Sequence, residues 1–271
     1  EEFKKVWLQD YHFQTEEANV LLKKNAFMRM LFETQQLRKK SLAENKQKFS
    51  ELLKSNAFYP VKTEIIYQLK DVAFEDKVAF LVLAMQTNDI KVRQTVAEFT
   101  TEIPLEFKSQ YETLLDDASY ETKEIAFMNM WKNIPESRSD YLAKAKDWIG
   151  GNDMSLRILF LTFSILSDEK ERAEKTSYYS ELVDYTSEKY ESSVRQNAII
   201  NMLSINDKDI TVLKSLVNAT THHKWQFSKF GKDKIRQLLK DDSYHGLFES
   251  LLPTLPESEK IQLQKLLSEK P

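Results

Sequence analysis

Apolar residues recur at helical spacing in a stretch that occurs three times along this chain. In residues 88–96, NDIKVRQTV, an acidic residue is followed three positions later by an aliphatic residue and then by an arginine. The stretches NDMSLRILF (152–160) and YESSVRQNA (190–198) keep the same order. Further apolar residues follow the aliphatic one at i+4 and i+7, as in Val92, Val96 and Phe99. This stripe predicts an amphipathic helix that buries one face.

Two looser copies extend the pattern into a repeat. The aligned positions are then Val61, Val92, Thr122, Leu156 and Val194, with spacings of 31, 30, 34 and 38 residues. Such spacings predict one helical hairpin per repeat, beginning at each aligned position. Pro104 and Pro135 lie 31 residues apart, where the second helix of a hairpin should begin, since a proline in the first turn loses no hydrogen bond. No helix is therefore expected to continue through either proline.

The polar residues of the repeat suggest how each helix begins and what its arginine does. The acidic residues, Asp89, Asp153 and Glu191, fall at or beside a helix start, where a carboxylate can cap free N–H groups. The arginines, Arg93, Arg157 and Arg195, follow four residues later, so an i,i+4 ion pair is available. We expect these arginines at equivalent places on successive hairpins, close to an acidic residue of their own repeat or of a neighbour.

The repeat resembles HEAT-type repeats over residues 60–204. This resemblance implies an all-α fold, an α-solenoid of about five HEAT-like helical hairpins, because stacked hairpins bury stripes that one hairpin cannot bury alone. In that family the acidic residue and the arginine mostly tie neighbouring repeats together. We therefore favour a structural role for them over a binding role.

The two ends of the chain do not repeat. Residues 1–59 are predicted to form an N-terminal helical cap, and within it residues 36–56 read as one long, highly charged helix. Residues 60–224 hold the repeats, and residues 225–271 are predicted to form three capping helices, the last one after Pro253 and Pro256. The three parts are expected to make one continuous domain.

Composition supports a helical globular chain. The chain has 271 residues, 41% of them hydrophobic and 30% charged, with only 4 glycines and 6 prolines. Average usage would give about 19 and 14, and β-hairpins need such residues in their turns. The net charge of −3 lacks the basic surplus of a nucleic-acid-binding protein. No apolar stretch is long enough to span a bilayer, and there is no cysteine.

The chain offers no pattern for catalysis or metal binding. Its four histidines are His12, His222, His223 and His245, without the i,i+3 or i,i+4 pairing of a helical zinc site. The acidic pairs 116–117 and 241–242 are interpreted as exposed turn residues at helix ends rather than as general acids or bases. We predict no catalytic residue, no metal ligand and no cofactor in this chain.

The only candidates for contact with a substrate or partner lie in one C-terminal segment. They are Trp225, Phe227, Phe230 and Arg236. The three aromatic residues could line a concave surface, but a capping role for them is favoured.

The ends of the chain also suggest a specific family. The segments EEFKKVWL, WQFSKFGKDKIRQLL and YHGLFESLLPTL, together with the repeats, resemble the C-terminal helical region of bacterial zinc aminopeptidases of the aminopeptidase-N (gluzincin) type. In that family a catalytic domain with G-x-M-E-N and H-E-x-x-H motifs precedes this region. Neither motif occurs here, so no catalytic or zinc-binding residue is carried over.

The resemblance implies a non-catalytic domain whose concave face limits access to the active site of the preceding catalytic domain and holds the body of a peptide substrate. Zinc would belong to the parent enzyme only, and a periplasmic or cell-envelope location is expected. Because the chain begins at Glu1 inside a helical pattern, we interpret it as a piece of a longer protein. The alternative is a free-standing HEAT-like scaffold for protein–protein interaction.

Overall fold

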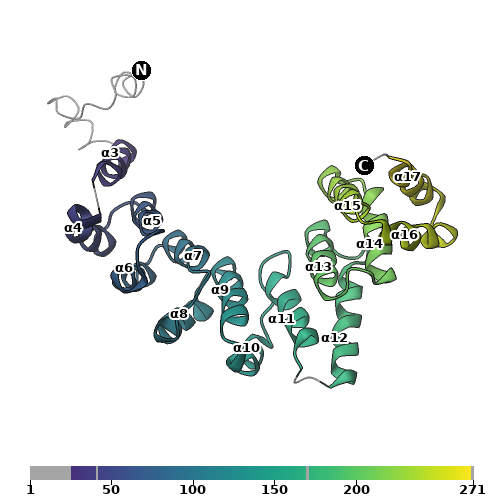
Figure 1. The fold of residues 1–271 in the computed structure, drawn as a ribbon, viewed down its shortest axis with the longest axis horizontal. Coiled ribbons are helices and arrows are strands. Elements are labelled where there is room, and N and C mark those ends of the chain that lie inside the picture. Colours follow the sequence, from purple (N-terminus) through teal and green to yellow (C-terminus); the bar gives the residue numbers. More distant parts are fainter. Residues whose placement is uncertain (1–25, 41, 169–170, 270–271) are drawn as a thin grey trace, which may run out of the picture. The chain divides into compact units, whose positions relative to one another are not determined.

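Helices make up the regular structure of the chain. The computed structural model describes residues 26–40, 42–168 and 171–269, and within these ranges it contains fifteen α-helices, several short 3-10 turns and no β-strand (Figure 1). The all-α prediction is confirmed. Residues 1–25 of the predicted N-terminal cap, His12 among them, lie outside the described residues.

The helices group into two compact units that divide between Pro135 and Glu136. The described helices of the first unit are α3 (Ala26–Lys39), α4 (Leu42–Lys54), α5 (Tyr59–Gln68), α6 (Phe74–Met85), α7 (Ile90–Phe99), α8 (Lys108–Glu112) and α9 (Tyr120–Asn133). Those of the second unit are α10 (Arg138–Ala145), α11 (Ser155–Leu166), α12 (Arg172–Tyr185), α13 (Ser192–Ile205), α14 (Ile210–Thr220), α15 (Trp225–Leu238), α16 (His245–Leu251) and α17 (Glu257–Ser268). The division into a cap, repeats and a second cap stays a prediction.

The five aligned positions all fall in the first turn of a helix. These helices are α5, α7, α9, α11 and α13, and each is followed by a second helix or a shorter helical arm. Neither proline lies inside an α-helix, because α7 ends at Phe99 and α9 at Asn133. Pro104 instead precedes the 3-10 turn Leu105–Phe107, and Pro135 begins another. The predicted helix starts and breaks are confirmed.

Helices close in sequence pack against one another within each unit. In the first unit α7 contacts both α5 and α9, and α6 packs on α4, α5 and α7; in the second, α11 contacts α12 and α13 (Figure 1). The apolar stripes face these contacts, as Val92 and Val96 are fully buried and Phe99 is half-buried.

The prediction of one long helix over residues 36–56 is wrong. Helix α3 ends at Lys39 and α4 begins at Leu42. Asn45, which is buried, explains the break, because its side-chain amide donates to the carbonyl oxygens of Leu37 (2.9 Å) and Lys40 (3.2 Å). These bonds satisfy acceptors that the end of α3 leaves open.

Three helices follow residue 224, as predicted, and the first packs very closely on α14. A Cβ atom on Gly231 of α15 would lie 2.9 Å from the carbonyl oxygen of Leu216 and 3.0 Å from the Cβ of Ala219. Only a glycine, which lacks a Cβ atom, lets the two helix backbones come so close to each other.

Candidate functional site

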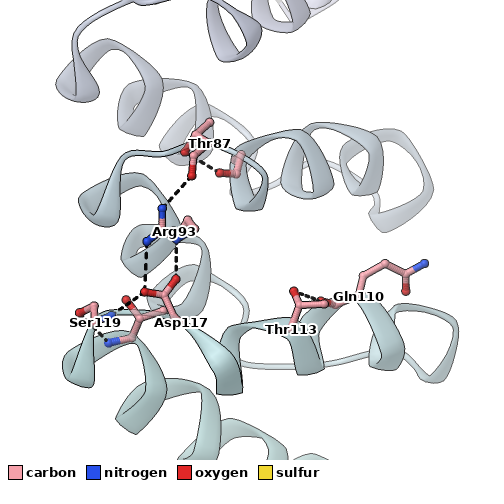
Figure 2. A network of polar contacts seen from close by, with 8 residues as sticks. Thr87, Arg93, Gln110, Thr113, Asp117 and Ser119 are labelled. Atoms are coloured by element: carbon pink, nitrogen blue, oxygen red, sulfur yellow. Dashed lines mark hydrogen bonds and ion pairs between the residues drawn. The ribbon is translucent and has the colours of Figure 1, made fainter. Parts of the chain in front are cut away.

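Arg93 joins the end of α6 to the start of α9 (Figure 2). Its Nη1 donates to the carbonyl oxygen of Thr87 (2.7 Å), and its Nε and Nη2 donate to the two carboxylate oxygens of Asp117, the latter at 3.2 Å. Asp117 also accepts the backbone N–H of Ser119 (2.8 Å), and the Ser119 hydroxyl caps α9 by accepting from the backbone of Thr122 (3.3 Å). One guanidinium thus fixes the loop that leads into the next repeat.

Asp117 corrects the interpretation of residues 116–117 as exposed turn residues. Asp116 is exposed, but the Asp117 side chain is only 3% exposed. Burial raises the pKa of Asp117, but the hydrogen bonds from Arg93 and Ser119 and the positive charges of Arg93 and Lys123 outweigh it, so the pKa lies below its usual range. A buried carboxylate is stable here because Arg93 donates two hydrogen bonds to it.

Arg157 repeats this arrangement in the second unit. Its Nε and Nη2 each donate at 2.8 Å to the carboxylate of Glu181 on α12, and its Nη1 donates to the carbonyl oxygen of Lys146 (3.0 Å). Arg93 and Arg157 both reach a carboxylate 24 positions later in the chain. The hydrogen bond to Arg157 is the main cause that lowers the pKa of Glu181.

The i,i+4 ion pairs that the sequence makes available are not formed. Asp89 instead pairs with Lys62 of the preceding repeat (2.9 Å), and Glu191 pairs with Lys224. The acidic residues lie at the edge of their helices, outside the helical geometry that brings i and i+4 together. None of the three is a side-chain cap, although Asp153 accepts the backbone N–H of Ser155, the first residue of α11 (3.3 Å).

Arg195 departs from the other two arginines. It is 3% exposed, and its partners are neutral: the carbonyl oxygen of Thr186 (3.0 Å) and the side-chain oxygen of Asn218. The Asn218 amide in turn donates to the buried carboxylate of Glu259 on α17 (2.8 Å). The guanidinium also lies 5.0 Å from the centre of the Phe227 ring. Burial lowers the pKa of Arg195. At Arg157, by contrast, the hydrogen bond to Glu181 raises the pKa.

The structure does not gather the four C-terminal candidates into one surface. Trp225 is 71% exposed at the start of α15, whereas Phe227 is buried beneath Arg195 and stacks on the half-buried Phe230 (6.0 Å between ring centres). Arg236 is exposed, and Glu269 accepts two hydrogen bonds from it, at 2.7 and 3.1 Å.

His222 and His223 lie before α15 with stacked rings, 4.2 Å between centres. The Nδ1 of His222 accepts the backbone N–H of Lys224 (3.1 Å). Partial burial, followed by the positive charges of His223, Arg195 and Lys224, lowers the pKa of His222. Across the described residues, no group of three or more histidine, aspartate or glutamate side chains is arranged to hold a metal ion.

A groove of about 660 Å³ in the first unit is the feature that sequence reasoning missed. It is bordered by the end of α5, the first half of α6, the second half of α7 and the loop that leads to Pro104. Its aromatic walls are Tyr67, Phe74 and Phe99, and its charged residues are Lys70, Lys77, Glu98 and Glu102. These residues come from separate elements, so no local motif marks them. The one signal is that Tyr67 and Glu98 occupy the same place in their repeats, six residues after Val61 and Val92.

No helix in the described part of the chain has the length and apolar character needed to cross a membrane. The sequence matches no model of a known protein family and shows no significant similarity to any curated protein.

Proposed function

We propose that this chain is a non-catalytic helical-repeat domain, an α-solenoid of about five HEAT-like hairpins running from α5 to α14, with helical caps at both ends. We further propose that it serves as the C-terminal domain of a zinc-dependent aminopeptidase, where it shapes peptide access to the active site of the preceding catalytic domain. Zinc would be held by that catalytic domain. The periplasm or cell envelope is the corresponding location.

The observation that supports the repeat is the equivalence of the basic residues on three of the five first helices, α5, α7 and α11. Lys62, Arg93 and Arg157 each follow the aligned residue directly, and each bonds a carboxylate 24 to 27 positions later. Arg195 occupies the same position with an amide partner 23 residues later. Equivalent contacts at equivalent spacings are typical of stacked repeats. The aminopeptidase assignment is supported by the resemblance of the terminal segments.

The experiment compares this chain alone with the product of the complete coding region that contains it. We expect the complete product to hydrolyse aminoacyl-anilides in a zinc-dependent way, and the chain alone to give no turnover. Removing the chain should change hydrolysis of peptides of ten or so residues more than that of single-residue reporters, because only a long substrate reaches a distal domain. A complete product without an H-E-x-x-H motif or zinc-dependent hydrolysis would refute the proposal.

A free-standing scaffold for another protein is the second candidate, and one observation favours it. Tyr59, Ile90 and Tyr120 are the first residues of α5, α7 and α9, and each is between 44% and 54% exposed. Three exposed apolar side chains in register on packed helices are typical of a protein contact surface. The same coding region decides between the candidates, since a scaffold needs no attached catalytic domain.

A further inference from the structure

The groove of the first unit carries charges of both signs that form no ion pair among the described residues. Neither Lys70 nor Lys77 pairs with a described carboxylate; the Lys77 ammonium lies 5.4 Å from the centre of the Phe99 ring. Glu102 has no described partner, and Glu98 accepts a single bond, from Gln94 (2.9 Å). The two lysines stand on the side of α5 and α6, and the two glutamates on the side of α7 and the loop after it.

Aromatic rings line the same groove as these charges. Tyr67 is 57% exposed, and Phe74 and Phe99 are half-buried. The Phe74 ring meets the edge of the buried Phe107 ring (5.4 Å between centres), so packing fixes its position. An aromatic side chain held in place offers a large contact area with little loss of rotamer entropy on binding.

We propose that this groove binds an extended peptide segment that carries an aromatic or long aliphatic side chain between an acidic and a basic residue. The apolar side chain would pack against Tyr67 and Phe99, the acidic residue would pair with Lys70 and Lys77, and the basic residue would pair with Glu98 and Glu102. Nucleic acid fits poorly, because the two glutamates would repel its phosphates. A small molecule also fits less well, since the groove is only partly enclosed, whereas small-molecule sites enclose most of their ligand.

The repeat also places an apolar side chain at the equivalent position of the next first helix, beyond the lining of the groove. Tyr67, Glu98 and Met128 stand six residues after the aligned positions of α5, α7 and α9, which pack in that order. All three are exposed, Met128 by 48%. A peptide that leaves the groove past Glu98 therefore meets a further apolar side chain on the next repeat.

This inference is independent of the proposed attachment to a zinc aminopeptidase, because binding is measured on the chain itself. The probes are two fluorescein-labelled peptides of opposite order, Gly-Glu-Phe-Leu-Lys-Gly and Gly-Lys-Leu-Phe-Glu-Gly, and a third in which serines replace the two apolar residues. Fluorescence polarisation with the full chain should show saturable binding of at least one of the first two. Binding should weaken as salt is raised, since exposed ion pairs are screened.

Two variants in the groove and one matched control test the site. Tyr67→Ala and Lys77→Ala should each weaken binding by about tenfold, the effect of losing a central contact residue. Ile261→Ala, which removes an apolar side chain of similar exposure (59% against 57%) on α17 in the second unit, should leave binding unchanged. Circular dichroism confirms that all variants fold.

Three results would overturn the proposal. The first is no saturable binding of either peptide up to about 1 mM, which is the weak end of specific recognition. The second is equal binding of the serine peptide, and the third is equal weakening by Tyr67→Ala and Ile261→Ala. If Tyr67→Ala changed only the self-association of the chain in sedimentation, the groove would be a contact between copies and the peptide proposal would also fail.

Discussion

A basic residue directly follows the aligned position in all five repeats. The five are Lys62, Arg93, Lys123, Arg157 and Arg195. Arg93 and Arg157 each hold a carboxylate through two N–H groups. Lys62 contacts the carboxylate of Asp89 through its single ammonium group. The arginine fork matches a carboxylate, whereas an ammonium acts as a point charge. The position and the positive charge of this residue are thus common to the repeats, while the residue that it bonds differs from one repeat to the next.

Replacing Arg93 by methionine should leave the buried Asp117 carboxylate without its main partner. We expect Arg93→Met to lower the free energy of unfolding at pH 7 by about 3 kcal/mol, as is typical when one member of a buried ion pair is removed. Urea denaturation followed by circular dichroism measures the change. Lys91→Met is the control, because the ion pair of Lys91 with Glu121 is exposed on both sides and should matter little.

The same variant should change how stability depends on pH. In the folded protein the pKa of Asp117 lies below its usual range, so between about pH 5 and pH 2 the unfolded chain binds more protons at this carboxyl than the folded chain. The stabilisation is therefore present at neutral pH and is lost as the pH falls. The difference in stability between wild type and Arg93→Met should shrink over that range. A difference that stayed constant down to pH 2 would mean that the Asp117 carboxylate is not the partner that matters.

At the scale of elements, the close contact between α14 and α15 depends on a residue that helix propensity disfavours. Glycine inside a helix costs about 1 kcal/mol relative to alanine, yet Gly231 lies in the middle of α15. It permits the approach of α14, whose Leu216 carbonyl oxygen would be 2.9 Å from an added Cβ.

Gly231→Ala should therefore destabilise the protein, whereas Gly246→Ala should not. An alanine at Gly246 meets nothing within 4 Å and should raise the melting temperature slightly or leave it unchanged. An alanine at Gly231 must push α14 and α15 apart, and we expect a clear fall in melting temperature despite its better helix propensity. A stabilising Gly231→Ala would show that the two helices can separate without loss.

The elements themselves were largely predictable from the sequence, because their signals are local. The aliphatic stripe located the starts of α5, α7, α9, α11 and α13, and the prolines located the breaks. The break between α3 and α4 was missed because its cause is the side chain of Asn45 reaching back to Leu37. Asp117 was misjudged for a similar reason: its burial depends on Arg93, which is 24 positions away. The groove is lined by residues from three helices and a loop, so no local sequence signal predicts it. Only the equivalent positions of Tyr67 and Glu98 in their repeats point to it.

For the whole molecule, packing between sequence neighbours limits how far a local change can spread. The strongest helix contacts join elements that lie close in the chain, and they form two compact units divided at residue 135. If the proposed solenoid is right, stability is approximately a sum of nearest-neighbour terms, and local opening follows the weakened part.

Hydrogen–deuterium exchange followed by mass spectrometry should show this locality directly. Arg93→Met should speed amide exchange in α7 and α9, which the arginine connects through Asp117 and Ser119, and leave exchange in α14 to α17 unchanged. Gly231→Ala should do the reverse, because its added methyl group disturbs the contact of α14 with α15. If either variant speeded exchange evenly from α3 to α17, the chain would open as one cooperative body. The stability of each repeat would then depend on every other, and the nearest-neighbour description would have to be abandoned.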